Sequence, residues 1–200
     1  MFHKIQAVID KIDFNTISEI RKNELAVLIH FIQERKDKNQ PVLLNFICTH
    51  NSRRSQFSQI WGQVASNYFG ISAQSYSGGV EETAFNERAV ASLERFGFKM
   101  SKEGVGNPKY FIQWDENIEP LVMFSKMYDD SINPSSGFAA IMTCSHADEN
   151  CPVVAGCEKR IPIRYKDPKS FDDTPLESAL YDYRSFEIAT ELFYVFSKVN

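Results

Sequence analysis

A mostly apolar run that leads straight into a polar, cysteine-led loop constrains the fold more than any other feature. Val42 to Ile47, opened by Pro41, has the pattern of a buried strand. The loop Cys48 to Arg54 follows, and helical spacing of apolar side chains resumes at Ser55. In an open α/β sheet, ligands bind beyond the carboxyl ends of the strands. The junction therefore predicts a binding loop between a buried strand and a helix.

The rest of the chain continues this alternation of strands and helices. Its 200 residues and 43% hydrophobic content suffice for the core of one α/β domain. We expect an open, mainly parallel four-stranded sheet with helices on both faces. Besides the strand before Cys48, the predicted strands are 72–77, 138–144 and 161–165, and the predicted helices include 86–96 and 176–199.

Two segments lie outside this regular pattern. Residues 1–40 read as an N-terminal helical extension whose second helix is capped by Asn15 or Thr16, and residues 41–200 as the catalytic domain. Residues 110–128 contain two extended runs joined by a polar turn, which predicts a β-hairpin insertion. The sequence leaves open whether these segments form a lid, a dimer contact or neither.

Charge and hydropathy exclude several classes of protein. The net charge of -4 argues against a nucleic-acid partner. No apolar run reaches the ~18 residues of a membrane span, and the N-terminal residues lack the apolar core of a signal peptide. We therefore expect a cytoplasmic protein. In that reducing compartment, four cysteines are more often catalytic, redox-active or metal-binding than structural.

The loop itself favours an anion and a reactive thiol. Unpaired amides and the helix dipole at the start of a helix attract an oxyanion and favour the thiolate form of Cys48. Arg54 can bind two oxygens of the anion, Ser55 can donate to the sulfur, and Asn51 can brace the loop. The plainer alternative is a buried cysteine at a strand end with a surface arginine nearby.

The run from Phe46 to Gln56 resembles the signature Cys-x-Gly-Asn-x-x-Arg-Ser of the low-molecular-weight protein tyrosine phosphatases and of the arsenate reductases built on the same fold. The resemblance implies that Cys48 is the nucleophile, Asn51 the loop-ordering residue, Arg54 the anion clamp and Ser55 the thiolate partner. The implied oxyanion-binding loop comprises Thr49, His50, Asn51, Ser52, Arg53 and Arg54.

Two residues depart from the signature. His50 replaces the usual glycine; histidine tolerates a left-handed backbone better than most residues, and its ring could instead tune the thiolate. Arg53 stands where the family often has a second cysteine, which excludes redox regulation through that position.

A second motif separates the two branches of the family. Cys144, six intervening residues, Cys151 and Pro152 are similar to the Cys-x6-Cys-Pro segment of thioredoxin-coupled arsenate reductases. The resemblance implies that Cys144 attacks Cys48 to release arsenite, and that Cys151 then carries the disulfide to thioredoxin or a similar thiol donor. Alternatives are a core thiol with an unrelated surface thiol, or a zinc site built from Cys144, His146, Cys151 and Cys157.

Asp167-Pro168 matches the Asp-Pro pair that supplies the general acid in this superfamily. Lys169 and Ser170 replace the aromatic pair that often follows it in tyrosine phosphatases, which weakens the phosphotyrosine interpretation. Some reductases of this class bind potassium near the loop, but Gln59 occupies the acidic position here. We expect no metal and no cofactor.

The sequence therefore predicts reduction of an arsenate oxyanion by a thiol relay that thioredoxin regenerates. The alternative is a phosphatase that hydrolyses phosphotyrosine or small phosphate esters through a Cys48 phosphoenzyme. A third possibility is a non-catalytic module that binds an anion or a partner.

Overall fold

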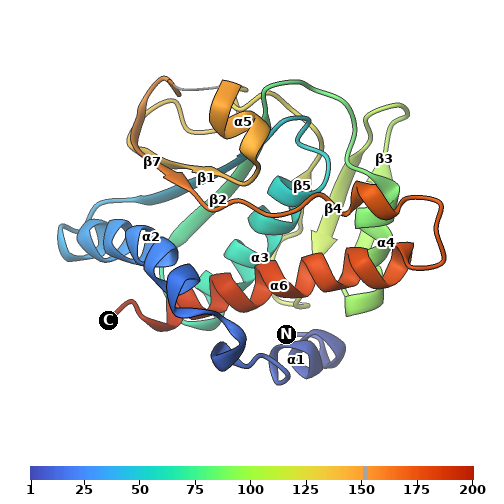
Figure 1. Cartoon of the computed structure of the whole chain (residues 1–200), viewed down its shortest axis with the longest axis horizontal. Coiled ribbons are helices and arrows are strands. Elements are labelled where there is room, and N and C mark those ends of the chain that lie inside the picture. The colour runs from blue at the N-terminus through green and yellow to red at the C-terminus, as the bar shows by residue number, and fades with distance from the viewer. Residues whose placement is uncertain (151–152) are drawn as a thin grey trace.

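The apolar run after Pro41 forms the central strand of the molecule. In the computed structural model, which describes residues 1–150 and 153–200, a four-stranded sheet has the order β2-β1-β6-β7, and all of its pairings are parallel. Its strands are β1 (Val42–Cys48), β2 (Ala73–Gly79), β6 (Phe138–Met142) and β7 (Cys157–Pro162). The predicted open, parallel sheet is confirmed (Figure 1).

Helices cover both faces of this sheet, because its central strands are apolar on both sides. In β6, Ala139 and Ile141 join the large core cluster, whereas Phe138, Ala140 and Met142 join a second cluster on the opposite face. The large cluster lies under α2 (Glu19–Asp37), α3 (Arg54–Tyr68) and α6 (Glu177–Ser197), and the short α5 (Ser145–Asn150) covers the second. The two layers can be followed in Figure 1.

The helix predicted at 86–96 is α4 (Glu87–Phe96). Asn86 caps its start by accepting a hydrogen bond from the amide of Arg88. Gly97 ends it with a φ of 103°, which glycine adopts without strain. Both ends are therefore set by local residues of the expected kinds.

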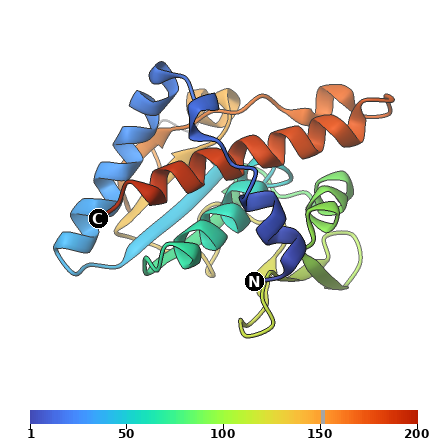
Figure 2. The same ribbon diagram turned by 90° about the horizontal axis from the view of Figure 1, so that it is seen from below.

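The N-terminal segment contains α1 (His3–Ile9), a 3-10 helix η1 (Phe14–Thr16) and α2. The predicted cap of α2 is wrong: Ser18, not Asn15 or Thr16, accepts from the amide of Arg21, because Asn15 and Thr16 are taken up by η1. Figure 2 shows α1 beside α4, on the side of the molecule where α6 runs. Buried side chains of α1 and α2 belong to the large core cluster. The domain boundary at residue 40 stays a prediction.

The predicted hairpin is part of a second, antiparallel sheet of three strands. It consists of β3 (Lys99–Glu103), β4 (Lys109–Gln113) and β5 (Leu121–Met123). The pairing of β4 with β5 confirms the hairpin. β3 was not predicted, because its side chains are largely exposed and show no apolar alternation. After Met123 the chain returns to the main sheet, where Met127 bridges Gly79 in parallel.

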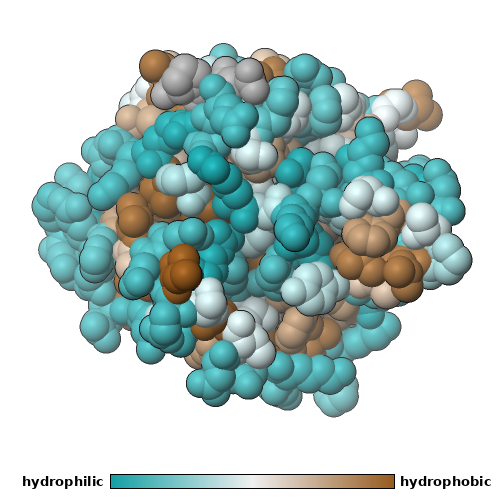
Figure 3. Space-filling model, viewed as in Figure 1, coloured by the Kyte–Doolittle hydropathy of each residue, from teal (hydrophilic) through white to brown (hydrophobic). Residues whose placement is uncertain are grey.

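The last strand lies earlier than the predicted 161–165. β7 covers Cys157–Pro162 with an irregular register beside β6, and the amides of Ile163 and Tyr165 still donate to Met142 and Thr143. A short 3-10 helix, η2 (Pro168–Phe171), precedes α6. Figure 3 shows a mostly hydrophilic face with apolar atoms in separate small patches. Within residues 1–150 and 153–200, none of the helices has both the length and the apolar composition that a membrane span requires.

Candidate active site

The loop that follows β1 presents its main-chain amides without partners. Residues 49–53 form no helix or strand, and α3 begins directly afterwards at Arg54. Within the part of the chain that the structure describes, the amides of residues 49–53 donate no hydrogen bond. Since these amides lie at the N-terminus of a 15-residue helix, they can bind the oxygens of a compact anion.

Cys48 lies at the start of this loop and is only 3% exposed. Its sulfur is 3.0 Å from the hydroxyl oxygen of Ser55. The side-chain amide of Asn51 donates to that same oxygen at 2.9 Å, so the Ser55 proton can point at the sulfur. In this arrangement the Ser55 hydroxyl can donate a hydrogen bond to the sulfur of Cys48.

Asn51 fixes the path of the loop. It is fully buried and has a φ of 45°, in the left-handed region. Its Oδ1 accepts from the amide of Lys126 at 3.0 Å, and its carbonyl accepts from Nε2 of Gln56 at 2.9 Å. The loop is therefore tied to the start of α3 and to the segment that returns from the second sheet.

The expected adjustment at His50 is not found. The left-handed residue of the loop is Asn51, and His50 is not among the residues of positive φ. The His50 ring is about half exposed, and its Nδ1 lies 3.1 Å from Oε2 of Glu81 without hydrogen-bond geometry. Its carbonyl accepts from the hydroxyl of Ser125 at 2.9 Å. No contact of the ring with Cys48 is found in the described residues, so the geometry gives no support to thiolate tuning by His50.

Arg54 and Asp167 meet at the loop. Nη2 of Arg54 donates to Oδ2 of Asp167 at 2.6 Å, and Nη1 donates to the carbonyl of Tyr165 at 3.2 Å. The Nε atom of Arg54 is buried and has no partner among the described residues. Asp167 also caps η2 through the amide of Lys169. The structure thus brings the predicted clamp and the predicted acid together, although they are 113 residues apart.

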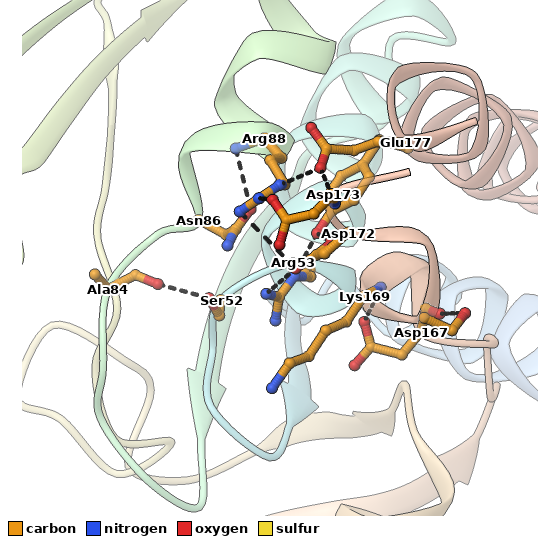
Figure 4. A network of polar contacts seen from close by, with 12 residues as sticks. Ser52, Arg53, Ala84, Asn86, Arg88, Asp167, Lys169, Asp172, Asp173 and Glu177 are labelled. Atoms are coloured by element: carbon orange, nitrogen blue, oxygen red, sulfur yellow. Dashed lines mark hydrogen bonds and ion pairs between the residues drawn. The ribbon is translucent and has the colours of Figure 1, made fainter. Parts of the chain in front are cut away.

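The side chain of Arg53 serves a different contact. Its Nε donates to the hydroxyl of Tyr181 at 2.8 Å, and its guanidinium lies 3.5 Å from a carboxylate oxygen of Asp172. Burial raises the pKa of Tyr181, so the phenol stays protonated and donates to Asp172 at 2.7 Å. Figure 4 shows Arg53 and Asp172 beside Arg88, which binds the carboxylate of Glu177. Arg53 therefore ties the loop to the segment that carries Asp167.

Ser52 makes a similar tie on the other side of the loop. Its hydroxyl donates to the carbonyl of Ala84 at 2.7 Å, and its own carbonyl accepts from the amide of Asn86 at 3.0 Å. Figure 4 shows Ser52 and Ala84 facing each other. The segment before α4 is held against the loop in this way.

Cys144 reaches the loop from the end of β6. Its sulfur is 3.4 Å from the hydroxyl oxygen of Thr49 and accepts from the amide of Ala147 at 3.3 Å. The residue is 1% exposed and shares a packed cluster with Cys48; both are free thiols. Cys151 lies outside the described residues, and Cys157 opens β7.

The acidic position of the potassium-binding relatives holds Gln59 in this chain. The hydroxyl of Ser77 donates to Oε1 of Gln59 at 2.6 Å, and both side chains are buried. A neutral amide thus occupies the position of the acid and already binds the serine. Among residues 1–150 and 153–200, no three side chains of His, Cys, Asp or Glu gather as metal ligands would.

Sequence reasoning missed Lys126, which lies 2% exposed beside the loop. Burial lowers its pKa to about 8, and its ammonium is 5.0 Å from the ring centre of Phe124. Gln56, which bridges the carbonyls of Asn51 and Phe124, was also missed. Both connect the loop to a segment about 70 residues away, and no local pattern announces such a contact.

Known proteins resemble the chain in sequence and in fold, although no protein-family model matches it. Arsenate reductase 2 of Staphylococcus epidermidis is 29% identical over 123 residues, or 62% of this chain and 76% of that protein. A solved arsenate reductase in the phosphate-binding state has a TM-score of 0.51 at 15% identity, covering 80% of this chain and 99% of that one. A low-molecular-weight phosphotyrosine phosphatase from Vibrio cholerae O395 has a TM-score of 0.50 at 13% identity, covering 76% and 92%. The chain is thus similar in sequence to arsenate reductases and similar in fold to the low-molecular-weight protein tyrosine phosphatases.

Proposed function

We propose that the chain reduces arsenate to arsenite, with Cys48 as nucleophile and Cys144 and Cys151 as a disulfide relay that thioredoxin regenerates. Its relatives and its fold support an enzyme of either the arsenate reductase or the protein tyrosine phosphatase type. The observation that carries the choice is the second buried thiol beside the loop: Cys144 lies 3.4 Å from Thr49, the residue next to Cys48. Hydrolysis of a phosphate ester needs only one thiol.

The proposed first step is substitution at arsenic. The Cys48 thiolate forms a bond to As(V), and one arsenate oxygen leaves as water after taking a proton from Asp167. The free loop amides and Arg54 would bind the remaining oxygens. Asp167 lies 2.6 Å from Arg54, which supports its placement near the leaving oxygen.

The proposed second step transfers two electrons. The Cys144 thiolate attacks the Cys48 sulfur, the sulfur–sulfur bond forms, and the bond from sulfur to arsenic breaks. Its electron pair stays on arsenic, which leaves as arsenite, As(III). Cys151 would then attack Cys144 and free Cys48, and two thiols of thioredoxin would reduce the last disulfide.

A second candidate function follows from the same loop. Without use of Cys144, the Cys48 loop, Arg54 and Asp167 could form and hydrolyse a phosphoenzyme. The similarity in fold to a phosphotyrosine phosphatase favours this candidate. Lys169, where tyrosine phosphatases often have an aromatic residue, speaks against a phosphotyrosine substrate.

Two assays on one set of variants separate the candidates. The first couples arsenate reduction to NADPH oxidation through thioredoxin and its reductase, and the second follows hydrolysis of an aryl phosphate. A reductase loses arsenate turnover in Cys48→Ser, Cys144→Ser and Cys151→Ser, but loses aryl phosphate hydrolysis only in Cys48→Ser. Cys157→Ser is the matched control and should keep both activities. Full arsenate turnover in Cys144→Ser would disprove the relay, and a wild type inert in both assays would favour the binding module.

A further inference from the structure

A histidine lies within reach of the second thiol through one hydroxyl group. The Thr49 hydroxyl oxygen is 3.4 Å from the sulfur of Cys144 and 3.2 Å from Nδ1 of His146. We propose that His146 is the base that takes the proton of Cys144 through Thr49, so that Cys144 can attack. This inference rests on the proposed reductase function and assigns a further residue to it.

Cys144 needs such a route because it is buried. A thiol must lose its proton before it can attack another sulfur, yet Cys144 is only 1% exposed, so its burial keeps bulk solvent from accepting that proton. The amide of Ala147 donates to its sulfur at 3.3 Å and can stabilise the thiolate once it forms, but an amide cannot accept the proton. Thr49, itself 8% exposed, can accept one proton and donate another at the same time.

The proton balance follows the two contacts. With the other ring nitrogen of His146 protonated, Nδ1 accepts from the Thr49 hydroxyl, and the Thr49 oxygen accepts from the thiol of Cys144. Transfer of both protons leaves a thiolate at Cys144, a neutral Thr49 and a proton on Nδ1. Because the His146 side chain is exposed, the imidazolium can return its proton to solvent after arsenite has left.

The charged groups around α5 have other partners. Asp148, on the same helix, is buried and binds Arg160 and Arg164 from the β7 segment. Glu81, beyond β2, faces His50. Neither carboxylate contacts Thr49 or Cys144, and this leaves His146 as the base in reach of that pair within the described residues.

The test is a single-turnover measurement of arsenite release, made in the Cys151→Ser background so that the reaction stops after the attack by Cys144. His146→Ala should slow arsenite release by about 100-fold, the usual contribution of a general base. The rate of arsenite release is divided by the rate of aryl phosphate hydrolysis of the same sample. That second rate reports on the state of the loop, because hydrolysis does not use Cys144. Because His146 is exposed, added imidazole should restore much of the lost rate.

A double-mutant comparison tests the route through Thr49. Thr49→Val keeps the shape of the side chain and removes its hydroxyl group. When it is added to His146→Ala, imidazole should no longer restore the rate of arsenite release. Thr49→Val with His146→Ala should be little slower than Thr49→Val alone, since both changes break one path. Unaltered arsenite release in His146→Ala would overturn the inference, and so would a slow variant that imidazole fails to rescue. A wild type that releases no arsenite would instead overturn the proposed function.

Discussion

Replacement of Asn51 by alanine should damage the loop more than any other single change in it. Asn51 is fully buried and left-handed, with a φ of 45°. An alanine in that conformation is strained by about 1–2 kcal/mol. The change also removes the acceptor of the Lys126 amide and the donor to Ser55. A buried group left without a partner costs about 1–3 kcal/mol.

Together these two terms predict that Asn51→Ala lowers the free energy of unfolding by about 2–5 kcal/mol. That is a large part of the ~5–15 kcal/mol typical of a whole domain. Asn51→Gly relieves the backbone strain but still lacks the side-chain bonds. It should therefore be more stable than the alanine variant by about 1–2 kcal/mol.

The assay is urea unfolding of both variants and the wild type, followed by circular dichroism, with aryl phosphate hydrolysis on the folded fraction. Hydrolysis should fall in both variants, because the Ser55 hydroxyl loses the bond that orients it toward Cys48. Equal stabilities of the alanine and glycine variants would refute the backbone argument. A loss below about 1 kcal/mol in Asn51→Ala would refute the whole estimate, since even one unpaired buried group exceeds it.

Three further predictions concern groups around the loop. Lys126→Met should raise stability at pH 7 by up to about 3 kcal/mol, because the charged amine is buried. Since burial lowers the pKa of Lys126 from 10.5 to about 8, the gain in the free energy of unfolding should be complete below pH 8 and should vanish as the pH rises to 10.5. Urea unfolding of both proteins at several pH values measures this gain. Asp167→Asn should lower the kcat of aryl phosphate hydrolysis by about 100-fold when the leaving group is poor. The loss should be far smaller for nitrophenyl phosphate, because nitrophenol leaves without a proton. Equal losses with both substrates would contradict the role of Asp167 as the acid. Gly78→Ala should lower the free energy of unfolding by about 3 kcal/mol, since the new Cβ would lie 2.2 Å from the Tyr128 backbone, and an unchanged melting temperature would contradict that contact.

The parts of the fold that depend on local patterns were predictable from the sequence. The buried strand before Cys48 and the helix after Asn86 lie where the apolar spacing predicts them. β3 was missed because its side chains are exposed and polar and show no strand pattern in the sequence. Its backbone hydrogen bonds with β4 hold it in place. The cap of α2 was misplaced by a few residues, since several polar side chains near its start are equally good caps.

The same distinction between local patterns and contacts of distant segments holds for the candidate site. The residues of the loop were predictable because they are consecutive in the sequence. Asp167 and Cys144 were predictable because the segments around them resemble motifs of the family. The contacts of Lys126, Gln56 and Tyr181 with the loop join distant segments, and only the folded chain reveals them. Arg53 stays a predicted residue of the anion-binding loop through its amide, whereas the contact of its side chain with Tyr181 was not predicted.

The disulfide formed in a single turnover tests the proposed reaction most directly. A Cys151→Ser/Cys157→Ser variant is mixed with arsenate in the absence of any other thiol, and the products are analysed by arsenite detection and by peptide mass mapping without reduction. The proposed mechanism predicts about one arsenite per chain and a single disulfide, between Cys48 and Cys144, that is absent without arsenate. Arsenite without that disulfide, or a variant that keeps both thiols and leaves arsenate unchanged, would contradict it.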